Sequence, residues 1–215
     1  MSNQAKPKPA PNLKDQELKF GKTIVKVTNL SKVYWPEEKI TKGMLIDYYQ
    51  QMADFILPYL KDRPESLKRN PNGIRDAGFF HKDAGVDAPL WVKRFNIYST
   101  SSKKDVAYII CNDKSTLAYL NNLGCIELNP WNSRIQSLDK PDYLIIDIDP
   151  SSKNNFEQVI EVALAFRELL ESLSVEGYCK TSGASGIHIF IPMGKKYDYE
   201  QVKNLAHLLC SQVCT

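Results

Sequence analysis

Tyr143-Leu-Ile-Ile-Asp-Ile-Asp149 is an apolar run that ends in two acidic residues. Side chains alternate between the two faces of a β-strand, so the run predicts a strand on which Asp147 and Asp149 point the same way. Pro150 cannot continue a central strand and places the acids at the strand's exit. Adjacent carboxylates repel each other unless a cation lies between them, and Mg²⁺ or Mn²⁺ prefers oxygen ligands. The pair therefore indicates a metal site for phosphoryl or nucleotidyl transfer, although acids after a strand also serve as turn formers and helix N-caps.

The composition is that of an ordinary globular protein. The chain has 215 residues, of which 43% are hydrophobic and 25% charged, with a net charge of +3. Its five cysteines lack Cys-x-x-Cys spacing, which favours reduced thiols in a cytosolic compartment over a disulfide framework or a zinc site. Basic residues gather at 22–75 and 93–104 and acids at 157–176. A solvated face is the simpler explanation for each cluster.

Helical and strand periodicities place these residues in a mixed fold. Thr41 is the expected N-cap of a helix over 42–60, and Asp113 or Ser115 that of a short helix to Asn122. Further helices are expected at about 154–172 and from about 199, and strands at 23–28, 125–128, 143–149, 175–180 and 188–192. The order of elements from about residue 105 predicts an α/β (α+β) sheet domain. Residues 1–17 are expected to be a flexible lead-in, and the unfinished helix at Thr215 suggests part of a longer protein.

A second informative stretch is Lys180-Thr-Ser-Gly-Ala-Ser-Gly-Ile-His-Ile-Phe190. Its glycines let backbone N–H groups turn toward an anion, and Ser182 and Ser185 add hydroxyl donors. His188 begins the next strand, where it can donate to a phosphate or reach the reaction centre. A glycine turn usually only connects strands, and a single histidine is usually structural. Together with the Asp-x-Asp strand, the turn predicts a nucleoside triphosphate cradle that faces a metal.

Six motifs occur in an order and spacing that resemble the polymerase domain of bacterial DNA ligase D, in the archaeo-eukaryotic primase superfamily. They are Leu30-Ser-Lys-Val-Tyr-Trp-Pro36, Thr41-Lys-Gly43, Lys68-Arg-Asn-Pro-Asn-Gly73, Phe79-Phe-His-Lys82, Asp147-Ile-Asp149 and Thr181-Ser-Gly-Ala-Ser-Gly-Ile-His188. The resemblance covers nearly all of the chain after residue 20. It implies a primase-like fold with an RRM-like catalytic sheet and an N-terminal α/β subdomain. DNA binding would fall mainly at about 18–104 and catalysis at about 105–215.

The resemblance also implies an activity and a set of site residues. The activity is template-directed DNA or RNA nucleotidyl transfer that fills or extends ends in non-homologous end joining. Asp147 and Asp149 would hold two Mn²⁺ or Mg²⁺ ions, with His188 in the same catalytic site and an NTP or dNTP as substrate. The implied nucleotide-binding residues are Ser182, Gly183, Ser185, Gly186, His188, Asn129 and Arg69. The implied DNA-binding residues are Lys32 and Lys42 for the 5′-phosphate, Phe79 and Phe80 for base stacking, and Lys68 and Lys82.

Three departures from the family's pattern stand out. Asn129 replaces a histidine and can donate a hydrogen bond but carries no charge. Ser185 stands where relatives often have a lysine. The family's third metal-binding aspartate lies on a later strand, which would be beyond Thr215. Asp198 is no substitute, because it is in a loop before the last helix. We therefore expect the chain as given to polymerise little. A basic Lys42 at a helix N-terminus opposes the helix dipole, a cost that a bound anion would relieve.

Two other functions remain open from the sequence. One is a non-catalytic module that binds the 5′-phosphate of a DNA end, and the other is a primase-like protein that acts on another nucleotide. The implied partners are DNA ends, a Ku-like end-binding protein and a ligase domain. The expected location of the protein is the cytoplasm, in association with the nucleoid. The sequence does not distinguish ribonucleotides from deoxyribonucleotides.

Overall fold

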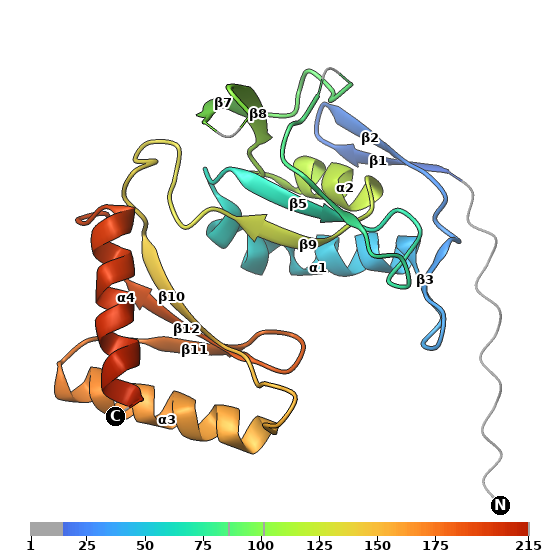
Figure 1. Ribbon diagram of the computed structural model, residues 1–215. Helices are drawn as coiled ribbons and strands as arrows, with labels where there is room; N and C mark the ends of the chain where they lie inside the picture. The colour runs from blue at the N-terminus through green and yellow to red at the C-terminus, as the bar shows by residue number, and fades with distance from the viewer. Residues whose placement is uncertain (1–14, 86, 101, 215) are drawn as a thin grey trace, which may run out of the picture. The chain divides into compact units, whose positions relative to one another are not determined.

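The computed structural model describes residues 15–85, 87–100 and 102–214, so residues 1–14 of the expected lead-in lie outside the described residues (Figure 1). The chain forms two compact units, Met1–Trp131 and Asn132–Thr215, and each is described by itself. Among the described helices, none is long and apolar enough to cross a membrane.

The first unit contains two helices and several small antiparallel sheets. Its helices are α1 (Lys42–Leu60) and α2 (Lys114–Asn122). Its strands are β1 (Gln16–Phe20), β2 (Thr23–Val27), β3 (Val33–Trp35), β4 (Ile40–Thr41), β5 (Glu65–Arg69), β6 (Phe79–His81), β7 (Arg94–Ser99), β8 (Lys104–Ile109) and β9 (Cys125–Pro130). The β6-β5-β9 sheet and the β1-β2, β3-β4 and β7-β8 ribbons are separate ladders.

Helix α1 positions one of the predicted sites. Thr41 caps it as predicted, because the Thr41 hydroxyl accepts a hydrogen bond from the Met44 N–H at 3.3 Å. The loop before β3 crosses the start of the helix, where a Cβ on Gly43 would lie 3.1 Å from the Leu30 carbonyl oxygen. Glycine at this position therefore permits the close approach of loop and helix.

The hydrophobic core of the first unit joins α1, α2 and the β6-β5-β9 sheet. Ala53, Leu67, Leu117 and Leu120 are among its fully enclosed members. This packing explains where the units divide. The sequence placed the division near residue 105, but α2 packs on α1 and β9 pairs with β5, so the first unit continues to Trp131.

The second unit is a three-stranded antiparallel sheet with two helices on one face (Figure 1). Its elements are β10 (Tyr143–Ile148), α3 (Phe156–Ser172), β11 (Tyr178–Thr181), β12 (Ile187–Pro192) and α4 (Tyr199–Val213). The strand order is β10-β12-β11, which is the start of a split β-α-β-β-α-β motif. Ile146 and Ile189 face Phe166 and Val202 in the core, and the opposite sheet face carries the polar residues.

Several boundaries differ from those predicted. Asp113, and not Ser115, caps α2, and its carboxylate accepts the Thr116 N–H at 2.7 Å. Strand β11 begins at Tyr178 and not near Val175, because the Val175 N–H is used to cap α3 through the Leu170 carbonyl at 2.9 Å. Strand β1 begins at Gln16, inside the range assigned to the lead-in, because it pairs with β2.

Candidate functional site

The two acids lie at the end of β10. Asp147 is on the strand and Asp149 directly follows it, and both are exposed, whereas Ile148 packs against the core. The alternation of a strand thus turns both carboxylates away from the helices.

His188 joins the acids from the neighbouring strand. It is the Cα partner of Asp147 in the β10–β12 ladder, and its Nε2 lies 3.2 Å from Asp147 Oδ1. The imidazole thus lies within ion-pair distance of one carboxylate oxygen of Asp147. The ladder register therefore places the ring beside the acids.

The glycine-rich turn between β11 and β12 is closed by the Ser182 side chain. Its Oγ accepts hydrogen bonds from the Gly186 N–H at 3.0 Å and the Ala184 N–H at 3.3 Å. The Ser182 N–H donates to the Gly186 carbonyl at 2.9 Å. Gly183 has φ +99°, a conformation that favours glycine. The turn therefore keeps the Ser182 hydroxyl hydrogen for a ligand, while the Gly186 N–H is used internally and Ser185 is exposed.

Gly186 brings this turn against the acids. A Cβ at Gly186 would overlap Asp149 Oδ1 and lie 2.7 Å from the Ile148 carbonyl oxygen. Only glycine allows the turn to lie this close to the end of β10. The structure thus gathers two segments, 147–149 and 182–188, at one end of one sheet.

The donor set fits a hard divalent cation in part. Mg²⁺ is commonly bound through one or two carboxylates together with substrate phosphates, which Asp147 and Asp149 match. Within the described residues, no group of three or more His, Cys, Asp or Glu is arranged to hold a metal. Asp198 does not add a ligand, because its carboxylate caps α4 by accepting the Gln201 N–H at 2.8 Å.

In the first unit, Lys32 and Lys42 come together at the start of α1. Lys32 Nζ donates to Asn72 Oδ1 at 2.6 Å, and Lys42 Nζ donates to Asn122 Oδ1 at 2.8 Å. The first backbone amides of α1 are already used, since the Lys42 and Gly43 N–H groups donate to the Lys32 and Leu30 carbonyls. An anion at this site would therefore bind to the two ammonium groups and not to the helix amides.

Electrostatics support an anion site there. Lys42 is largely buried, and burial, together with the nearby Lys32 charge, lowers its pKa to about 8, although Asp15 opposes the shift. In the part of the chain that the structure describes, no carboxylate forms an ion pair with Lys32 or Lys42. A phosphate would relieve the repulsion between the two ammonium groups.

The β6-β5-β9 sheet carries the other predicted residues. Phe80 and Glu127 are both Cα partners of Lys68, and Lys68 Nζ lies 2.9 Å from Glu127 Oε1. Asn129, two residues after Glu127, is exposed on that same face. Phe80 is 66% exposed, and its ring is free to stack on a base.

Phe79 lies on the opposite face of the hairpin, beside Arg69. The Arg69 guanidinium lies 5.2 Å from the centre of the Phe79 ring. Its Nε donates to the Leu123 carbonyl at 2.8 Å, and its Nη1 lies 3.2 Å from His81 Nδ1. Burial and the Arg69 charge lower the pKa of His81, although Asp83 partly opposes the shift. Neutral Nδ1 accepts from the guanidinium, so in this structure Arg69 anchors the hairpin. Lys82, directly after β6, is exposed.

Sequence reasoning missed three residues that hold these groups. They are Asn72, Asn122 and His81. His81 and Asn72 stand inside quoted motifs, so their positions gave a signal. Asn122 gave none, because it lies outside the motifs and 80 residues from Lys42 in the sequence.

Known proteins are similar to this chain in sequence. The family model of the LigD primase-polymerase domain matches residues 41–215. The bifunctional non-homologous end joining protein LigD of Bacillus subtilis is 33% identical over 189 residues, which are 87% of this chain and 30% of that protein. The multifunctional non-homologous end joining protein LigD of Mycolicibacterium smegmatis is 30% identical over 191 residues, which are 88% of this chain and 25% of that protein.

A solved structure agrees with the fold. The polymerase domain from Mycobacterium tuberculosis Ligase D, in complex with DNA, has a TM-score of 0.77 and 27% identity, and the match covers 88% of this chain and 68% of that chain. The fold thus defines the class as a primase-like domain. The chain belongs to the LigD primase-polymerase domain family.

Proposed function

We propose that this chain is the nucleotide- and DNA-end-binding part of a template-directed nucleotidyltransferase that acts in non-homologous end joining. The observation that carries the proposal is the placement of Asp147, Asp149 and His188 around the Ser182–Gly186 turn. The family membership and the DNA-bound neighbour support it. The substrate would be an NTP or dNTP, and the wider partners would be DNA ends, a ligase domain and a Ku-like protein in the cytoplasm.

In this proposal Asp147 and Asp149 hold Mn²⁺ or Mg²⁺. Such ions, when bound, activate the primer 3′-hydroxyl and neutralise charge on the phosphates. The chain's own side chains do the positioning. His188 orients Asp147, and the Ser182 hydroxyl donates to a triphosphate oxygen. Asn129 and Arg69 are proposed contacts to the nucleotide, with Arg69 first having to leave its present partners.

The DNA end is proposed to bind to the first unit. Lys32 and Lys42 hold the 5′-phosphate of the downstream strand as two point charges, without sequence preference. Phe80 and Phe79 stack on template bases, and Lys68 and Lys82 add backbone contacts. The proximity of the two lysines supports this role, since the Lys42 N–H donates to the Lys32 carbonyl at 2.8 Å. Burial, together with the Lys32 charge, lowers the pKa of Lys42.

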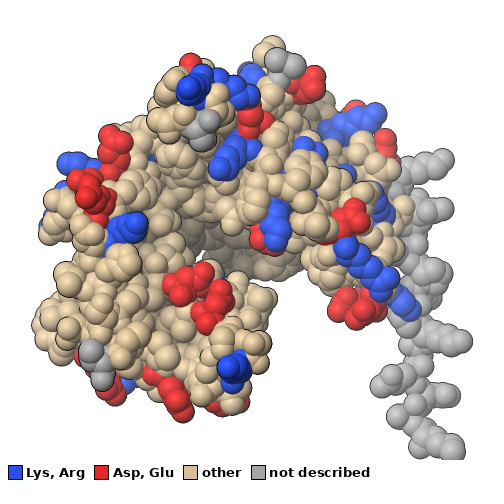
Figure 2. Space-filling view, viewed as in Figure 1, with Lys and Arg blue, Asp and Glu red and all other residues tan. Residues whose placement is uncertain are grey.

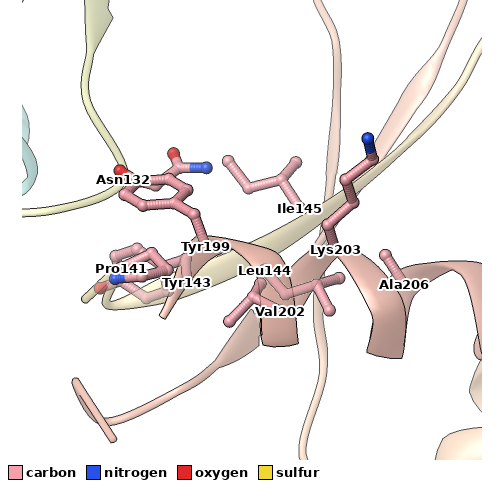
Figure 3. Close-up of a pocket in the computed structure, with 9 residues that line it drawn as sticks. All are labelled: Asn132, Pro141, Tyr143, Leu144, Ile145, Tyr199, Val202, Lys203 and Ala206. Atoms are coloured by element: carbon pink, nitrogen blue, oxygen red, sulfur yellow. The ribbon is translucent and has the colours of Figure 1, made fainter. Parts of the chain in front are cut away.

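A third carboxylate is proposed to come from a strand that follows α4 in a longer form of the protein. Within the described residues β10 pairs only with β12, so its other edge is open. Beside that edge lies a hollow of about 230 Å³ between β10 and α4, lined by residues such as Leu144 and Val202 (Figure 3). A strand added there would complete the split motif and run beside Asp147. We therefore expect the given chain to bind nucleotide and DNA but to polymerise little.

Primer extension on gapped DNA with Mn²⁺ tests the activity, with the chain extended by its natural continuation. Extension that is lost in the Asp147→Ala/Asp149→Ala variant supports the polymerase. No extension by the unmodified protein contradicts it and favours a non-catalytic end-binding module.

A binding measurement separates that module from a protein that acts on another nucleotide. Gapped DNA with a 5′-phosphate should bind more tightly than the 5′-hydroxyl form, and Lys32→Met and Lys42→Met should remove the difference. Lys61→Met, at the other end of α1, is the control. Equal affinities for the two DNAs would contradict the role of the lysine pair.

A further inference from the structure

The open face of the second unit's sheet has one row that crosses all three strands. Asp147 is the Cα partner of His188, and His188 is the Cα partner of Lys180. Residues in one register position of a sheet project from the same face. Asp147, His188 and Lys180 therefore stand side by side on the face opposite the helices.

Lys180 is the only lysine or arginine in the three strands Tyr143–Ile148, Tyr178–Thr181 and Ile187–Pro192. The turn that follows it, Ser182–Gly186, contains no cationic residue. In the described part of the chain no carboxylate forms an ion pair with Lys180, whose Nζ donates a hydrogen bond to the Thr181 carbonyl at 3.0 Å. Its charge is thus left without an opposite charge beside a turn suited to an anion.

The Lys180 side chain is directed along the sheet and not past its edge. Its Nζ lies 6.0 Å from the centre of the Phe190 ring, and Phe190 is two residues after His188 on the same face of β12. A cation over an aromatic face is held there by the ring's charge distribution. Phe190 therefore keeps the ammonium over the sheet face.

The distance from Asp147 to Lys180 across the three strands fits a ligand that spans this row of residues. Neighbouring strands are about 4.8 Å apart, so the backbone of Lys180 lies about 10 Å from that of Asp147, with His188 between them. A triphosphate whose α-phosphate lies near the acids would extend toward Lys180.

We propose that Lys180 binds the β- or γ-phosphate of a nucleoside triphosphate whose α-phosphate lies at Asp147 and Asp149. This rests on the proposed function. It adds the group that lets the site distinguish triphosphates from monophosphates. The uncharged Ser182 hydroxyl donates a hydrogen bond to the same triphosphate, and the Lys180 ammonium supplies a positive charge.

Equilibrium binding of ATP, ADP and AMP to this chain in Mn²⁺ tests the proposal. Lys180→Met should lower ATP affinity about tenfold, as expected for the loss of one charge-assisted contact, and change AMP affinity less than about twofold. Lys180→Arg should keep ATP affinity within about threefold of the unmodified chain. Lys203→Met is the matched control, because Lys203 is exposed on α4 on the helical side of the sheet.

The possible failures are distinguishable. ATP binding that is unchanged in Lys180→Met, or an equal loss for ATP and AMP, overturns the role of Lys180 and leaves the proposed function intact. Failure of the unmodified chain to bind ATP contradicts both. Thermal unfolding of Lys180→Met should match that of the unmodified chain, since the side chain is exposed. A lower midpoint together with weaker AMP binding would mark a folding defect and count against a phosphate contact.

Discussion

His188 Nε2 and Asp147 Oδ1 lie 3.2 Å apart across the β10–β12 ladder. A donor that orients a metal-binding carboxylate typically changes metal affinity by about 10–100-fold when removed. We expect His188→Ala to weaken Mn²⁺ binding about tenfold and Asp147→Asn to weaken it more. Isothermal titration with Mn²⁺ measures this, with the exposed Asp139→Asn as the control. Equal Mn²⁺ affinity in all three variants would contradict the proposed metal site.

The close approach of Gly186 to Asp149 gives a second prediction. A methyl group at position 186 would overlap the Asp149 carboxylate and crowd the Ile148 carbonyl. Gly186→Ala should therefore lower the free energy of unfolding by about 1–3 kcal/mol and weaken Mn²⁺ binding. Ser185→Ala, at an exposed position of the same turn, should do neither. Urea denaturation gives the first quantity, and an unchanged midpoint for Gly186→Ala would refute the contact.

The lowered pKa of Lys42 predicts opposite effects of pH on stability and on binding. Its folded pKa of about 8 is below the ordinary value of 10.5, so the ammonium destabilises the folded state below pH 8. This cost disappears as pH rises from about 8 to 10.5, and the free energy of unfolding should rise over that window. Affinity for a 5′-phosphate should fall as pH rises through about 8.

Denaturation and DNA binding between pH 7 and 10 measure both effects. Lys42→Met should flatten the rise in stability and lose the phosphate preference at every pH. The same pH slope in the variant and the unmodified chain would show that Lys42 is not the titrating group.

The exposed Phe80 ring predicts a loss of template affinity without a loss of stability. Phe80 is 66% exposed, and stacking on a base is typically worth about 1–3 kcal/mol. Phe80→Ala should weaken binding of single-stranded DNA by about this amount and leave the unfolding midpoint unchanged. Phe79→Ala should also lower stability, because Arg69 packs on the Phe79 ring. Fluorescence anisotropy measures the DNA binding. Phe55→Ala, which removes another exposed ring of this unit, is the control variant.

Glu65 predicts a pH-dependent instability in the first unit. Its carboxyl is fully buried, and neither oxygen has a hydrogen-bond partner among the described residues. Burial raises the pKa of this carboxyl from the ordinary 4.5 to about 8, although the Arg63 charge opposes the shift. The folded state then binds the proton more tightly than the unfolded chain. The free energy of unfolding should fall as pH rises from about 4.5 to 8.

Glu65→Gln should remove that fall and be more stable than the unmodified chain at pH 8 by about 1–3 kcal/mol. Urea denaturation at pH 5 and pH 8 measures it. Glu127→Gln, at an exposed position of β9, should keep the pH dependence. A fall of equal size in Glu65→Gln would assign it to another group.

The sequence alone determined much of the local structure. Alternation along 143–149 placed Asp147 and Asp149 on one face, and Thr41 marked the start of α1, because strand periodicity and helix capping depend on residues close together in the chain. The motifs also identified the family. These are properties that a short stretch carries by itself.

Only the tertiary structure decided which distant residues meet. Strand register placed His188 beside Asp147 and Lys180 beside His188, and packing brought Gly186 against Asp149. Folding also buried the Glu65 carboxyl without a hydrogen-bond partner among the described residues. Such contacts follow from ladder pairing and close packing between segments far apart in the sequence, so no local pattern encodes them.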